Sequence, residues 1–89
     1  MIVTTSRYAG KTARDLAKKI AENKKSEYMA RGKKTVNMLA ETAWKKGHDR
    51  ILVVEEKDEK PGFISEMLID HWGKWKWGRK REIEKQDNG

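Results

Sequence analysis

The sequence contains no cysteine, which excludes a disulfide framework, a thiol nucleophile and a cysteine-ligated zinc site. No apolar run approaches the roughly 18 residues that a membrane-spanning helix requires, and the apolar stretch at the N-terminus is too short for a signal peptide. The 89 residues allow one domain, and a hydrophobic fraction of 36% against a charged fraction of 39% predicts a small core. We therefore expect a small cytoplasmic domain with no membrane partner.

Positive charge exceeds negative charge, because 21 Lys and Arg residues stand against 14 Asp and Glu residues, a formal net charge of +7. The excess lies in residues 1–50 and 71–89, whereas acidic residues predominate in residues 51–70. A basic face of this kind attracts polyanions such as nucleic acids. The alternative is that lysines on solvated helix faces only keep a small domain soluble.

Hydrophobic periodicity predicts strands and helices in alternation. The expected order is strand 2–5, helix 13–21, strand 27–29, helix 36–44, strand 51–54, strand 63–69 and strand 74–77. Thr12 and Thr35 are the expected N-caps of the two helices. This order predicts an α/β fold, β-α-β-α-β-β(-β), built as a two-layer domain with a mixed sheet.

Three further features refine this organisation. The segment Ile51–Val54 is apolar throughout, so we expect its strand to be buried on both faces. Residues 55–62, which include the single proline, are expected to form a polar turn. Residues 1–83 are expected to form one domain, and the charged residues 84–89 a frayed tail.

Gly10-Lys11-Thr12 lies between a predicted strand and a predicted helix, where a phosphate-binding loop is credible. That pattern requires a glycine five residues before Gly10, and Thr5 is there. A small nucleotide-binding enzyme therefore stays an alternative. We expect no catalytic residue and no cofactor, and no metal site because the two histidines lie far apart in the sequence.

Basic residues surround the starts of both predicted helices. They are Arg7, Lys11 and Arg14 at the first helix and Arg31, Lys33 and Lys34 at the second. Cations at a helix N-terminus oppose the helix dipole, and a local conflict of this kind is typical of functional sites. We predict that these side chains contact phosphates. The alternative is a pair of lysine-rich turns without a partner, and the sequence leaves open whether the two groups share one edge of the sheet.

The tryptophans fall into two groups. Trp44 continues the apolar stripe of the second helix, so we expect it in the core. Trp75 and Trp77 share one face of a strand, with Lys74 and Lys76 on the other. Packing against a helix or a partner chain is the favoured interpretation of this pair, and base stacking is the alternative.

Several of these segments resemble the Brix-domain family, particularly its short archaeal members. The resemblance begins at Val3-Thr4-Thr5-Ser6-Arg7, includes Arg31-Gly32-Lys33-Lys34-Thr35, and continues to the Lys60-Pro61-Gly62 turn. It covers essentially the N-terminal half of the family's domain. Lys60 stands where the family usually has asparagine.

The resemblance implies a non-catalytic RNA-binding protein of ribosome biogenesis, acting in rRNA processing or subunit assembly. Its implied partners are rRNA or precursor rRNA and ribosome assembly proteins. The implied fold has two similar halves, each like the anticodon-binding domain of certain aminoacyl-tRNA synthetases. Two copies of this chain, paired through the Trp75 and Trp77 strand, would replace the second half as a homodimer. A protein-interaction module within an assembly particle is the main alternative function.

Overall fold

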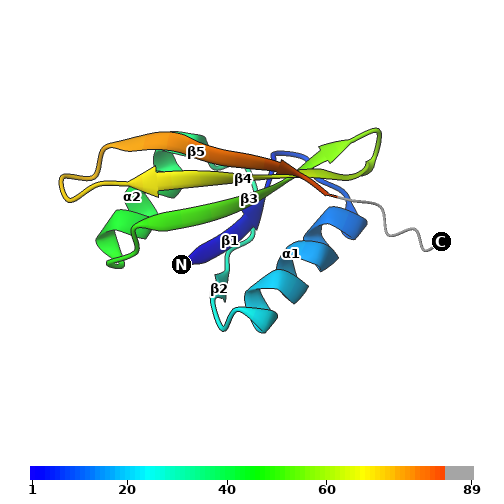
Figure 1. The fold of residues 1–89 in the computed structure, drawn as a ribbon, viewed down its shortest axis with the longest axis horizontal. Coiled ribbons are helices and arrows are strands. Elements are labelled where there is room, and N and C mark those ends of the chain that lie inside the picture. The colour runs from blue at the N-terminus through cyan, green and yellow to red at the C-terminus, as the bar shows by residue number, and fades with distance from the viewer. Residues whose placement is uncertain (84–89) are drawn as a thin grey trace.

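A five-stranded mixed sheet organises the chain, and the computed structural model describes residues 1–83 (Figure 1). The elements are β1 (Ile2–Thr5), α1 (Lys11–Asn23), β2 (Glu27–Tyr28), α2 (Val36–Lys45), β3 (Arg50–Lys57), β4 (Lys60–Ile69) and β5 (Trp75–Glu82). Their order in the sheet is β2-β1-β3-β4-β5. The predicted element order and mixed sheet are confirmed, while the predicted tail at 84–89 lies outside the described residues.

The sheet combines two kinds of pairing. β1 runs parallel to both β2 and β3, and α1 and α2 form the crossovers that parallel pairing requires. β3, β4 and β5 then form an antiparallel meander. Neither helix in residues 1–83 is long and apolar enough to cross a membrane.

The two helices lie on opposite faces of the sheet (Figure 1). Ile51 and Val53 of β3 point into a cluster with α2, whereas Leu52 and Val54 point into a cluster with α1. The expected burial of this strand on both faces is confirmed. The architecture is therefore helix–sheet–helix, and the prediction of two layers is wrong, because a strand that is apolar on both faces needs cover on both.

The hairpin between β3 and β4 is tighter than the sequence suggested. β3 continues to Lys57 and β4 begins at Lys60, so only Asp58 and Glu59 form the turn, with φ values of 57° and 63°. Left-handed φ at both central residues is typical of the two-residue hairpin turn that matches strand twist. The predicted polar turn over residues 55–62 is therefore wrong in extent, because most of these residues pair in the sheet.

The two helix starts agree with the sequence in only one case. Thr35 caps α2, and its Oγ1 accepts a hydrogen bond from Met38 N at 3.2 Å, as predicted. The N-cap of α1 is Gly10 rather than Thr12. The helix begins at Lys11, before its first buried residue, and Thr12 lies exposed within it.

The tryptophans have separate roles. Trp44 is 45% exposed, which overturns its predicted place in the core. Its Nε1 donates to His71 O at 3.1 Å, and its ring covers the backbone at Gly73. Trp75 and Trp77 share the face that α2 covers, with ring centroids 5.5 Å apart. Trp75 packs against the α2 cluster as expected, while Trp77 is 48% exposed.

Small residues bring α1 close to the sheet, and a larger one there should destabilise the fold. Ala13, Ala17 and Ala21 are the buried residues of α1. Ala17→Leu should lower the free energy of unfolding by about 1–3 kcal/mol, because added methylenes strain a packed core. Urea denaturation measures this, with Lys19→Leu on the exposed side of α1 as the control. Equal stability of the two variants would contradict this packing.

Candidate nucleic-acid interface

Both predicted basic groups lie at one edge of the sheet, where the parallel strands β1 and β2 end. The chain leaves β1 through Arg7 to enter α1, and it leaves β2 through Arg31 to enter α2. The two loops are joined directly, since Arg31 Nη1 donates to Thr5 O at 2.8 Å. The question that the sequence left open is therefore settled: the two groups share an edge, which we call the helix edge.

A shallow groove of about 430 Å³ lies between the two loops of the helix edge. The ends of β1 and β2 form part of its lining, and the side chains of Arg14 and Lys33 line it from the two helix starts. α1 and α2 depart from these adjacent strands to opposite faces of the sheet. Ligands of open α/β sheets bind at such a point, outside the carboxyl ends of strands whose connections diverge.

Arg31 is a structural cation rather than an exposed one. It is 8% exposed, and its Nε and Nη1 donate to Lys34 O at 2.7 Å and to Thr5 O. Burial lowers the pKa of the Arg31 guanidinium, and the nearby charge of Arg7 lowers it further. The side chain stays protonated, because an arginine in a protein is not deprotonated. Arg31 therefore ties the second loop to the end of β1.

The other predicted residues differ in how accessible their charge is. Arg7, Arg14 and Lys33 are exposed. The Nζ atom of Lys34 donates to Ala30 O at 3.2 Å. Lys11 is exposed but pairs with Asp15 at 2.7 Å, and this hydrogen bond lowers the pKa of the Asp15 carboxyl. Arg7, Arg14 and Lys33 therefore carry the charges that face solvent with the fewest partners among the other side chains described.

The N-terminus of α1 is already occupied by a carboxylate of the chain. Gly10 N donates to Glu56 Oε2 at 2.7 Å. Glu56 reaches this position from β3, on the face that α1 covers. A negative charge at a helix N-terminus stabilises the helix dipole. The structure therefore does not support the phosphate position that the Gly10-Lys11-Thr12 loop suggested, and it places the accessible cations beside the groove instead.

Tyr8 is a feature that sequence reasoning missed. It is 79% exposed and has φ of 62°, a left-handed conformation that is uncommon for a bulky residue. The Arg7 guanidinium lies 5.2 Å from the ring centroid, and its Nη2 donates to the Tyr8 hydroxyl at 3.3 Å. An exposed aromatic ring beside a cation is the combination on which unpaired bases stack. In the sequence Tyr8 looks like an ordinary loop tyrosine, and its left-handed backbone conformation is visible only in the structure.

Solved structures share this fold, and two of them are similar over most of this chain. Mil, an archaeal Imp4-like protein, aligns with a TM-score of 0.70 and 24% identity, covering 84% of this chain and 46% of Mil. A probable ribosomal biogenesis protein from Aeropyrum pernix K1 aligns with a TM-score of 0.71 and 28% identity, covering 92% of this chain and 42% of that protein.

The chain has an Imp4-like fold. This similarity confirms the likeness to Brix-domain proteins that the sequence suggested. The chain spans less than half the length of each of the two structures. No protein-family model matches the sequence, and no curated protein matches it.

Removing the Arg31 side chain should destabilise the fold rather than merely weaken binding. Arg31→Met should lower the free energy of unfolding by about 2–4 kcal/mol, because buried backbone carbonyls lose a charged donor. Urea denaturation measures this loss. Lys33→Met, which removes an exposed cation from the same loop, should stay within about 0.5 kcal/mol of the parent. Similar losses in both variants would contradict the structural role of Arg31.

Proposed function

We propose that this chain binds structured RNA at the helix edge and acts without catalysis in ribosome biogenesis. One observation supports the proposal above all. Two basic segments line the same groove, at the point where α1 and α2 leave adjacent strands for opposite faces of the sheet. Arg7, Arg14 and Lys33 would contact phosphates, and Tyr8 would stack a base. Arg31 would hold the two loops in place.

The assignment to ribosome biogenesis draws on the comparisons. The Aeropyrum pernix protein of the same fold is named as a probable ribosomal biogenesis protein. rRNA or its precursor is the RNA that this role would offer, and assembly proteins are the further partners. The basic net charge of +7 agrees with an RNA partner, because phosphate contacts supply most sequence-independent affinity.

A protein partner is the second candidate, and β5 favours it. β5 is an outer strand of the sheet, and Trp77 on it is 48% exposed. A homodimer through this strand stays a prediction. Two copies of β5 side by side would bring Lys76, Arg79 and Arg81 of each chain close to one another. An acidic strand is therefore a better match to this edge than a second copy.

Neutralising the helix edge should weaken RNA binding and its salt dependence together. Arg14→Gln with Lys33→Gln should reduce the slope of log affinity against log salt by about 0.7–0.9 for each phosphate that the variant no longer neutralises. Titration of an rRNA hairpin fragment at several salt concentrations measures this slope. The control, Lys19→Gln with Lys45→Gln, removes the same charge away from the groove. Equal slopes in both variants, or no binding by the parent, would overturn the proposal.

Removing the Tyr8 ring should reduce affinity without changing the salt slope. Tyr8→Ala should weaken binding of the same fragment by about 1–3 kcal/mol, the usual contribution of one stacked base. Tyr8→Phe retains the ring and should retain most of the affinity. A loss of equal size in both variants would show that the hydroxyl, or the loop conformation, matters rather than stacking.

A further inference from the structure

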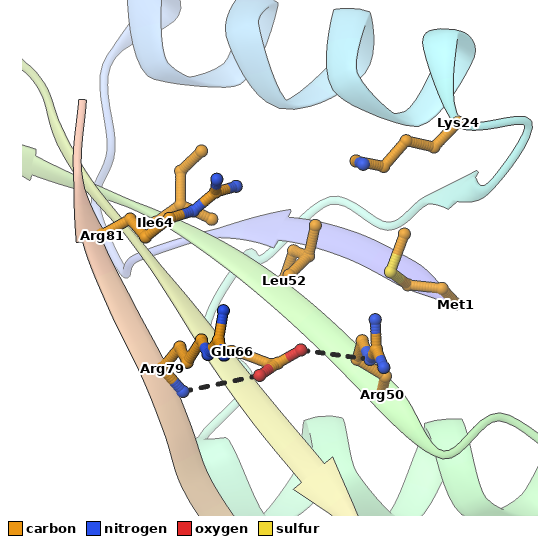
Figure 2. Close-up of a pocket in the computed structure, with 8 residues that line it drawn as sticks. All are labelled: Met1, Lys24, Arg50, Leu52, Ile64, Glu66, Arg79 and Arg81. Atoms are coloured by element: carbon orange, nitrogen blue, oxygen red, sulfur yellow. Dashed lines mark hydrogen bonds and ion pairs between the residues drawn. The ribbon is translucent and has the colours of Figure 1, made fainter. Parts of the chain in front are cut away.

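A second basic cavity lies on the α1 face of the sheet, beneath the end of α1 rather than at the helix edge. It has a volume of about 250 Å³, and we call it the sheet cleft. Its cations are Lys24 from the end of α1, Arg50 from β3, and Arg79 and Arg81 from β5. Leu52 and Ile64 form an apolar floor. Figure 2 shows these side chains extending into one space from separate elements of the fold.

An irregularity in β5 places both arginines in the sheet cleft. Ser65 pairs with Lys80 and Met67 pairs with Trp77, so Gly78 and Arg79 together lie opposite Glu66. This β-bulge changes the alternation of β5, and Arg79 and Arg81 then face the cleft while Lys80 faces the other way. Bulges of this kind re-aim side chains next to functional sites.

A glycine lies at the bulge. A Cβ atom at Gly78 would lie 2.9 Å from Glu66 Oε1 and 3.1 Å from Leu68 Cδ1. The missing side chain at Gly78 therefore leaves room for the side chains of Glu66 and Leu68 from β4. The glycine that interrupts an alternating strand in the sequence thus lies at the bulge beside Arg79.

Glu66 organises the cleft without neutralising it. Its carboxylate pairs with Arg50 Nε at 3.2 Å and accepts from the backbone N of Arg79 at 3.4 Å (Figure 2). Within residues 1–83, the side chains of Lys24, Arg79 and Arg81 form no ion pair. One carboxylate therefore faces four cations, and the cleft keeps a positive excess.

We propose that the sheet cleft binds phosphodiester groups of the RNA strand whose other end lies at the helix edge. The proposal rests on the proposed function. Arginine presents a planar fork that matches phosphate oxygens in a bidentate manner. Arg79 and Arg81 stand two residues apart on one strand face, about 6.6 Å along the strand, a spacing of the same order as that between successive phosphates.

The size of the cleft favours an extended polyanion over a free nucleotide. Sites for whole small molecules usually measure about 300–1,000 Å³, and this cavity is smaller and open to solvent. It can hold one or two phosphate groups while the rest of the ligand continues outside. Arginines over an apolar floor also suit a sugar–phosphate backbone, which presents charged and apolar surface in alternation.

The experiment compares the cleft with the helix edge in the full chain. Arg79→Gln with Arg81→Gln should weaken binding of an rRNA fragment long enough to reach both surfaces at least about tenfold, and reduce the salt slope by about 0.7–0.9 for each phosphate left without its arginine. Lys74→Gln with Lys76→Gln is the matched control, because it removes the same charge from the same hairpin outside the cleft, and neither lysine forms an ion pair within residues 1–83. All four side chains are exposed, so urea denaturation should show equal stability.

The outcomes separate this proposal from the proposed function. If the cleft variant behaves like its control while Arg14→Gln with Lys33→Gln loses affinity, the cleft proposal is overturned and the helix edge stands. If only the cleft variant loses affinity, the helix edge fails, and the proposal that one RNA strand joins the two surfaces is overturned with it. If neither loses more than its control, both fail.

A second measurement identifies the ligand chemistry. Inorganic phosphate should cause saturable NMR shifts of the Ile64 and Arg79 amides in the parent and not in the cleft variant. Poly-glutamate that binds the cleft as tightly as RNA of equal charge would overturn the proposal in favour of an acidic protein segment.

Discussion

The central strand β3 presents apolar side chains to both faces of the sheet, and the rest of the fold depends on this constraint. Ile51 and Val53 require cover on one side, and Leu52 and Val54 require it on the other. The connections supply it, because a right-handed crossover from β1 to β2 and another back to β3 run in opposite directions. The helices then lie on opposite faces, and their starts diverge from adjacent strands. The groove at the helix edge is a consequence of how the core is covered.

Several cations lie together where α1 and α2 begin, and other groups of the chain must offset their mutual repulsion. Arg31 is stabilised by the carbonyls of Thr5 and Lys34, although burial and Arg7 both disfavour its charge. Glu56 provides the opposite charge at the start of α1. The remaining cations are left facing solvent. One arginine thus organises the loops and the others stay accessible, an arrangement that the proposed polyanion site would require.

Sequence reasoning recovered what depends on local pattern. The periodicity of the two helices, the Thr35 cap and the doubly buried Ile51–Val54 strand all follow from neighbouring residues. It failed for features that depend on contacts between segments far apart in the sequence. The number of layers depends on the directions in which the two helical crossovers run. The position of Trp44 depends on the turn between β4 and β5, where its Nε1 donates to His71 O. The sheet cleft could not be predicted, because its cations come from separate elements and a bulge at Gly78 sets the phase of two of them.

The helix edge and the sheet cleft are joined through α1, which begins at one and ends at the other. Arg14 lines the groove from the first turns of this helix, and Lys24 lines the cleft from its C-cap. A helix of 13 residues is about 20 Å long. An RNA strand that contacted both surfaces would therefore span several nucleotides. Once one surface is bound, the second contact is intramolecular and gains from a high effective concentration. If the proposed RNA binding holds, two weak basic surfaces at opposite ends of one packed helix would bind a long RNA far more tightly than either would bind a short one. The small Ala13, Ala17 and Ala21 side chains, which pack this helix against the sheet, would then also fix the distance between the two surfaces.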